Sequence, residues 1–213
     1  MHTDDLVSKL AARATPLDPR YAAKRFGRAL LAGLSASSGL LVALYGVRSD
    51  MPQLIATPQF WLKLAFPLAV VAASVQLATR LARPGARTTL AWATAAAPLV
   101  VMWIVAALIV WATPASLRLG LMLGPASRVG TLNIVLLSVP GFIASFWAMR
   151  GLAPTRLALA GAGAGLLAGA QAVLVYTLYV LDIATPFWSV WYVTGMAIPV
   201  LAGALLGPVL LRW

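Results

Sequence analysis

Six long apolar stretches fill this chain from about residue 29 to its end, separated by short connections that contain basic residues, proline or glycine. A helix rises about 1.5 Å per residue, so a stretch of about twenty residues crosses a hydrocarbon core of about 30 Å. In that environment a single segment satisfies all of its backbone polar groups only as a helix. The pattern predicts an all-α integral membrane protein built as a six-transmembrane-helix bundle.

The predicted spans divide the chain into a tail of residues 1–28 and a transmembrane domain of residues 29–213. Their ranges are 29–47, 60–82, 89–113, 130–149, 157–181 and 190–211. The longest connection covers residues 114–128 and contains Gly120, Gly124 and Pro125. The other connections are short, so neighbouring helices are expected to pack antiparallel.

Composition supports the membrane class. Hydrophobic residues make up 62% of the chain and charged residues 10%, whereas a soluble domain carries roughly 25% charged residues. Polar side chains are too few to cover a water-exposed globule. The first 28 residues are largely polar and further spans follow, so no cleavable signal peptide is expected.

The basic residues predict an orientation. A net charge of +11 raises the alternative of nucleic-acid binding, but these residues flank the spans, as the positive-inside rule describes, and do not form one phosphate-binding patch. With the N-terminus inside, the inner face holds Lys9, Arg13, Arg20, Lys24, Arg25, Arg28, Arg80, Arg83, Arg87, Arg150, Arg156 and Arg212. The outer face holds Arg48, Lys63, Arg118 and Arg128. Both termini are therefore predicted to be cytoplasmic.

Residues that carry out chemistry are scarce. The chain has no cysteine or glutamate, and His2 is its only histidine. We therefore expect no enzymatic activity, metal site or cofactor. The prolines inside spans (Pro67, Pro98, Pro140 and Pro199) leave open a small transporter or channel subunit with kinked helices, although mid-membrane ionisable groups are nearly missing. A structural membrane subunit is a third alternative.

Small residues predict close helix packing. Gly161, Gly165 and Gly169 recur every fourth residue in the fifth span, and Gly203 and Gly207 repeat the spacing in the sixth. Such faces let helices approach closely. We expect these two spans to pack together, with a homodimer through the same faces as the alternative. The neutral polar residues Gln76, Asn133 and Gln171 are candidates for hydrogen bonds between helices.

The N-terminal tail has the pattern of a short amphipathic helix. Thr3 is a suitable N-cap, and Asp4 and Asp5 follow in the first turn, where the helix dipole favours anions. One apolar stripe contains Leu6, Val7, Leu10, Ala11 and Ala14. Three turns are marginal alone in water. The acidic start argues against the bilayer surface, where helices are usually basic, and favours a groove on a cytoplasmic partner.

The whole chain resembles the NrsF-type membrane anti-sigma proteins. The resemblance rests on the opening Thr3-Asp4-Asp5-Leu6, the six spans, and two stretches: VPGFIASFWAMR at residues 139–150 and WYVTGMAIPVLAGALLGPVLLRW at residues 191–213. It implies an inhibitor in the bacterial inner membrane that holds an extracytoplasmic-function sigma factor until an envelope or oxidative signal releases it. The sigma-contacting element would then be Thr3, Asp4, Asp5, Leu6, Val7 and Leu10.

The chain departs from that family at the outer ends of the fourth and fifth spans. Family members typically carry cysteines there, but neither residues 128–132 nor residues 179–182 contain one. Thiol-based sensing is therefore excluded for this chain. Arg128 and Asp182 are the charged residues in these neighbourhoods, and a contact between them on the outer face is a hypothesis for signal sensing.

Overall fold

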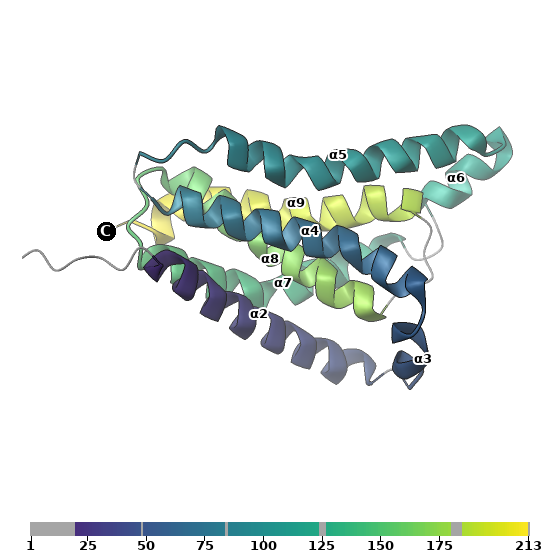
Figure 1. The fold of residues 1–213 in the computed structure, drawn as a ribbon, viewed down its shortest axis with the longest axis horizontal. Coiled ribbons are helices and arrows are strands. Elements are labelled where there is room, and N and C mark those ends of the chain that lie inside the picture. The colour runs from purple at the N-terminus through teal and green to yellow at the C-terminus, as the bar shows by residue number, and fades with distance from the viewer. Residues whose placement is uncertain (1–19, 48, 84, 124–126, 180–184, 213) are drawn as a thin grey trace, which may run out of the picture.

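The computed structural model describes residues 20–47, 49–83, 85–123, 127–179 and 185–212. These ranges contain eight helices and no strand (Figure 1). The helices are α2 (Tyr21–Tyr45), α3 (Met51–Ile55), α4 (Pro58–Leu81), α5 (Thr89–Ala112), α6 (Ala115–Leu123), α7 (Ser127–Arg150), α8 (Leu157–Tyr179) and α9 (Thr185–Leu210). Six of them are long and apolar enough to cross a membrane, all except α3 and α6. The predicted all-α class with six long apolar helices is confirmed.

Several elements differ from the sequence prediction, among them the short helix α3 in the predicted connection between the first two spans. Helix α2 begins at Tyr21, not near residue 29, because its basic first turns are compatible with a helix and Phe26 is fully buried there. The predicted connection 114–128 contains helix α6, which packs against α9. The indole of Trp191 in α9 donates a hydrogen bond to the carbonyl of Met122 at 3.0 Å. Tertiary contact therefore supports helical structure where glycine and proline predicted only a connection.

Helix α8 is the centre of the structure (Figure 1). It contacts α9, α7, α4 and α2. Within its most apolar 18 residues, 83% are buried. A helix that is apolar on every side is typical of such a position. The first half of α8 consists largely of alanine and glycine, so neighbouring helices can approach it from several directions.

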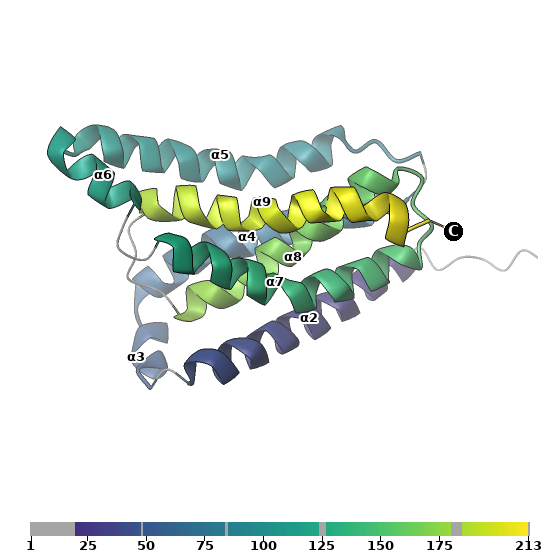
Figure 2. The same ribbon diagram turned by 180° about the vertical axis from the view of Figure 1, so that it is seen from behind.

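Helices α2 and α5 lie on opposite edges of the structure (Figures 1 and 2). Helix α5 packs mainly against α4 and α9. Only 17% of its most apolar 18 residues are buried. Its exposed side chains include Trp103, Ile104, Leu108 and Trp111. Apolar side chains on this scale are compatible with a hydrocarbon environment.

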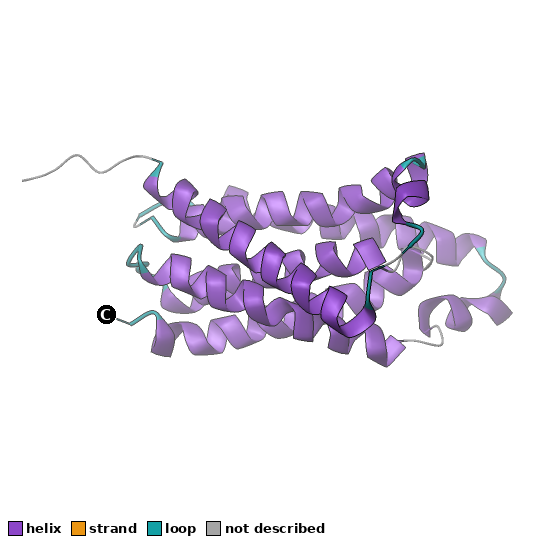
Figure 3. Ribbon diagram, turned by 90° about the horizontal axis from the view of Figure 1, so that it is seen from below, coloured by secondary structure: helices purple, strands orange, loops and turns teal. Residues whose placement is uncertain are grey.

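The long helices place the chain connections at two ends of the molecule (Figure 3). One end holds the start of α2, the α4–α5 and α7–α8 connections and the end of α9. We call it the basic end, because its described residues include Arg20, Lys24, Arg25, Arg28, Arg80, Arg83, Arg87, Arg150, Arg156 and Arg212. At the opposite end the described basic residues are Lys63, Arg118 and Arg128.

Backbone contact joins α8 to α9. A Cβ atom at Gly161 would overlap the carbonyl oxygen of Gly203, and one at Gly165 would overlap the carbonyl oxygen of Pro199. Gly169 lies against Met196, whose Cα would be 3.1 Å from such a Cβ. A Cβ at Gly203 or Gly207 would likewise overlap a backbone carbonyl oxygen of α8. This glycine face is thus covered within one chain and is not open to a second copy.

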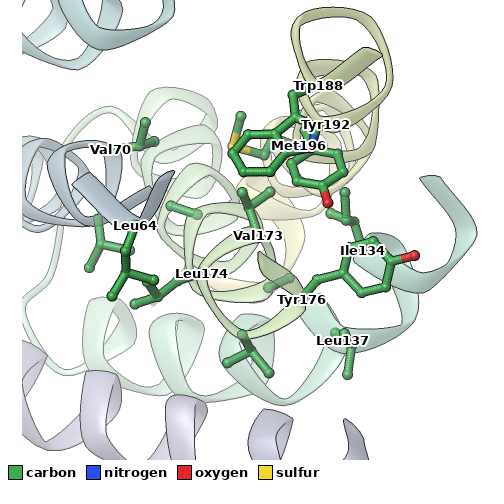
Figure 4. Close-up of a cluster of buried hydrophobic side chains, with 14 of the residues drawn as sticks. Leu64, Val70, Ile134, Leu137, Val173, Leu174, Tyr176, Trp188, Tyr192 and Met196 are labelled. Carbon is green, nitrogen blue, oxygen red and sulfur yellow. The ribbon is translucent and has the colours of Figure 1, made fainter. Parts of the chain in front are cut away.

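The largest apolar core surrounds the second half of α8 (Figure 4). Leu64 and Val70 approach from α4, and Ile134 and Leu137 from α7. Helix α9 contributes stacked aromatic rings, with the Trp188 and Tyr192 centroids 5.2 Å apart. A second cluster lies toward the basic end and includes Phe26, Phe146 and Met149. Burial of these side chains supplements the backbone contact between α8 and α9.

Substituting Gly165→Ala is expected to destabilise the protein by about 1–3 kcal/mol, because overpacking at a rigid backbone forces helices apart. The matched control is Gly39→Ala in α2, where a Cβ meets nothing within 4 Å. That change should be neutral or stabilise by up to about 1 kcal/mol through helix propensity. Unfolding in mixed micelles, followed by tryptophan fluorescence, measures both. Equal effects of the two substitutions would contradict the α8–α9 contact.

Candidate functional site

The residues predicted to contact a partner lie mostly outside the described residues. Thr3, Asp4, Asp5, Leu6, Val7, Leu10 and Asp182 are all outside them. Arg128 lies in the first turn of α7, at the end opposite the basic end. The predicted packing glycines are Gly161, Gly165, Gly169, Gly203 and Gly207, which lie at the α8–α9 contact. What the structure describes is therefore the base of the tail, where α2 begins, and the helices that hold it.

Arg25 joins the start of α2 to the end of α7. Its Nε donates to the carbonyl of Ala148 at 3.0 Å, and its Nη2 donates to the carbonyl of Trp147 at 2.9 Å. The last carbonyls of a helix have no partner within the helix, and the dipole makes that end attractive to a cation. The guanidinium also lies 4.3 Å from the centroid of the Trp147 ring, which adds a cation–π interaction. Its Nη1 donates to the hydroxyl of Tyr21 at 3.2 Å.

Gly151 leaves room for this contact. It follows α7 directly, and a Cβ at this position would overlap the guanidinium of Arg25. A larger residue would displace Arg25 from the end of the helix. The contact of the Arg25 guanidinium with the end of α7 therefore requires glycine at position 151.

Close contact between α2 and α7 continues along both helices. The Ser37 hydroxyl donates to the carbonyl of Leu137 at 2.8 Å. A Cβ at Gly33 would lie 3.0 Å from the Cα of Gly141. Gly141 and Trp147 both belong to the stretch 139–150 that the sequence analysis singled out. This stretch therefore forms much of the surface of α7 that packs against α2, the helix that follows the tail.

Gln171 lies fully buried in α8, next to Gly33 and Gly141. Neither the nitrogen nor the oxygen of its side-chain amide has a hydrogen-bond partner among the described residues. An unsatisfied buried polar group costs about 1–3 kcal/mol. The two other polar residues behave as expected: Thr94 donates to Gln76 at 3.2 Å, and Asn133 donates to Tyr176 at 3.4 Å, in each case between helices. The α2–α7–α8 junction thus contains a polar group whose hydrogen bonds are unmade in this packing.

The sequence predicts Arg25 only as a basic residue that flanks the first span, and its role at the end of α7 is not predicted. Its carbonyl partners lie 122 and 123 residues away, so no local pattern could reveal them. The quoted stretch 139–150 was the one available signal, and it identifies one side of the interface. Within the described ranges no group of three or more histidine, cysteine, aspartate or glutamate residues could hold a metal ion.

Comparison with known proteins gives one consistent family. Residues 10–213 match the family model "Negative regulator of sigma F", NrsF. The chain is 40% identical over 213 residues to the "Probable anti-sigma-F factor NrsF" of Azospira oryzae, and 33% identical over 222 residues to the "Anti-sigma-F factor NrsF" of Caulobacter vibrioides. Both alignments cover all of this chain and all of the relative. No solved structure matches the chain.

Substituting Arg25→Gln should loosen the start of α2. Hydrogen bonds from a charged donor contribute roughly 1.5–3 kcal/mol each, so the local loss should exceed about 1 kcal/mol. Hydrogen–deuterium exchange of the peptide covering residues 21–28 in detergent should rise in this variant. Arg28→Gln is the matched control, because Arg28 is exposed one turn further along α2. An unchanged exchange rate in Arg25→Gln, or an equal rise in the control, would contradict the contact.

Proposed function

This chain belongs to the NrsF family of negative regulators of sigma F, and we propose that it is a membrane-bound anti-sigma factor for an extracytoplasmic-function sigma factor. The observation that carries the proposal is the sequence identity of 40% and 33%, over the whole chain, to proteins named "Probable anti-sigma-F factor NrsF" and "Anti-sigma-F factor NrsF". An anti-sigma factor works by binding, in line with a chain that is poor in catalytic side chains.

We place the protein in the bacterial inner membrane with both termini in the cytoplasm. Six long apolar helices support a membrane location. The excess of arginine and lysine at the basic end supports a cytoplasmic position for that end under the positive-inside rule. The start of α2 and the end of α9 both lie there.

The tail is proposed as the element that holds the sigma factor. Residues 1–28 form the docking tail and residues 29–213 the transmembrane domain, with the first turns of α2 joining the two. The stripe of Leu6, Val7 and Leu10 would fill an apolar groove, in the helix-in-groove mode. Asp4 and Asp5 would pair with basic residues of the sigma factor, and Thr3 would cap the helix. The match to the family model begins at residue 10 and so leaves out residues 3–7. The alignments with both relatives include them, because they cover the whole chain.

Release of the sigma factor is proposed to run through α7. This helix begins at the opposite end with Arg128 in its first turn and ends against Arg25, at the base of the tail. A shift of α7 along α2 would change how the tail is presented. The unmade hydrogen bonds of Gln171 at the α2–α7–α8 junction supply a reason for a second packing, in which this amide gains partners. A coupling of this kind needs two states that the signal favours differently.

Full-length protein in nanodiscs should bind the sigma factor encoded nearest its gene, and Leu6→Ala/Leu10→Ala should weaken binding by about a hundredfold. Burying one leucine contributes roughly 1.5–3 kcal/mol, and 1.4 kcal/mol is a factor of ten. The control Leu31→Ala/Leu62→Ala truncates two exposed leucines of α2 and α4 and should bind as the parent does. Calorimetry or biolayer interferometry measures both affinities.

Deleting residues 1–15 tests the same proposal in cells. Transcription from promoters that depend on the sigma factor should rise, while the amount of protein in the membrane stays constant. Continued repression by the truncated protein would refute the role of the tail. It would favour a membrane subunit that acts in another way, such as a transporter or channel subunit.

The outer-face hypothesis makes a separate prediction. If Arg128 and Asp182 form a contact that holds the inhibiting state, Arg128→Asp and Asp182→Arg should each change repression or the response to an oxidant. The double exchange, Arg128→Asp/Asp182→Arg, should restore both properties, because the pair is then reversed. A reporter gene under the control of the sigma factor measures this. Two silent single variants would eliminate the pair as a sensor.

A further inference from the structure

A pocket rich in arginine lies between two connections at the basic end. Its volume is about 280 Å³, and its walls come from the end of α4, the α4–α5 connection and the α7–α8 connection. The side chains that matter here are Arg80, Arg83, Arg156, Thr88 and Thr155. Three arginines and two threonines thus line one small space.

The described residues supply no carboxylate to this pocket. Asp50 is the one acidic residue in the described ranges, and it precedes α3 at the opposite end. Cations gathered around one pocket repel each other, and an anion bound among them relieves that repulsion. Guanidinium groups bind phosphate through paired hydrogen bonds.

Two helices begin at the pocket and add to its positive potential. Helix α5 starts at Thr89, and the side chain of its N-cap residue, Thr88, makes no capping hydrogen bond. Helix α8 starts at Leu157, directly after Arg156. Neither first turn contains an acidic residue. The first N–H groups of a helix lack partners within the helix, and the dipole there favours an anion.

An apolar groove begins one helical turn away. Trp92 lies four residues after the N-cap residue Thr88, and its backbone N–H donates to the carbonyl of Thr88 at 3.0 Å. It lines a groove of about 330 Å³ between α5 and α9. Further lining residues are Ala95, Ala96, Leu99, Leu166, Met196 and Val200. A pocket rich in arginine and an apolar groove, reached by residues one helical turn apart at the start of α5, suit an amphiphile.

We propose that these two features bind one anionic phospholipid, with its phosphate in the arginine pocket and an acyl chain in the groove. The pocket lies where the long apolar helices end, which is the depth of lipid headgroups in a membrane. Basic pockets between membrane helices on the cytoplasmic side are known to bind such headgroups. The proposal depends on the membrane location but not on sigma-factor binding, so either can fail without the other.

Native mass spectrometry of the full-length protein in a neutral detergent tests the site. Phosphatidylglycerol should be retained in preference to phosphatidylcholine with the same acyl chains. The variant Arg80→Gln/Arg156→Gln should lower the apparent affinity for phosphatidylglycerol by about tenfold or more. The matched control is Arg87→Gln/Arg150→Gln, which removes the same charge at the same end without touching the pocket. Equal retention of the two lipids, or an equal loss in the control, would overturn the proposal.

Two further arms distinguish the lipid from free phosphate. Ala96→Phe fills the apolar groove and should weaken lipid binding, whereas Ala97→Phe, on an exposed neighbour outside the groove, should not. Inorganic phosphate should displace the lipid only weakly. If phosphate bound more tightly than the lipid and Ala96→Phe had no effect, a soluble anion would replace the lipid as the ligand. Equal melting temperatures of the variants and the parent confirm that all are folded.

Discussion

Contact between the backbones of α8 and α9 sets the positions of the other helices. Gly161 and Gly165 face the carbonyl oxygens of Gly203 and Pro199 with no side chain between them. In a hydrocarbon environment burial of apolar surface gives little drive for association, so van der Waals contact at this range carries much of the stability. Because α8 also presents small residues to α4 and α7, one helix sets the spacing of its neighbours.

The polar contacts are arranged around this close-packed centre. Arg25 closes the end of α7 and holds the start of α2 against it. Ser37 joins the same two helices nearer their middle. Gln171 contributes no hydrogen bond although it lies at the junction. The α2–α7 interface is thus hydrogen-bonded at its basic end and in its middle, and it lies next to an unsatisfied amide of α8.

The sequence predicts the helices well because hydrophobic length is a local property. Hydropathy predicts too late a start for α2 because it marks where apolar residues begin, while a helix extends as far as its caps and contacts allow. Helix α6 was missed for a related reason: contact with Trp191 outweighs Gly120. The arginine pocket and the Arg25 contact could not be predicted, since each unites segments far apart in the chain. The sigma-docking tail stays a prediction.

The central position of α8 has a consequence for biosynthesis. It is the fifth of the six long helices in chain order, so α2, α4 and α7, which all pack against it, leave the ribosome before it exists. Until then α4 and α2 share few contacts, and α5 has only α4 beside it. Asn133 in α7 therefore lacks its hydrogen-bond partner, the hydroxyl of Tyr176, until α8 has been made.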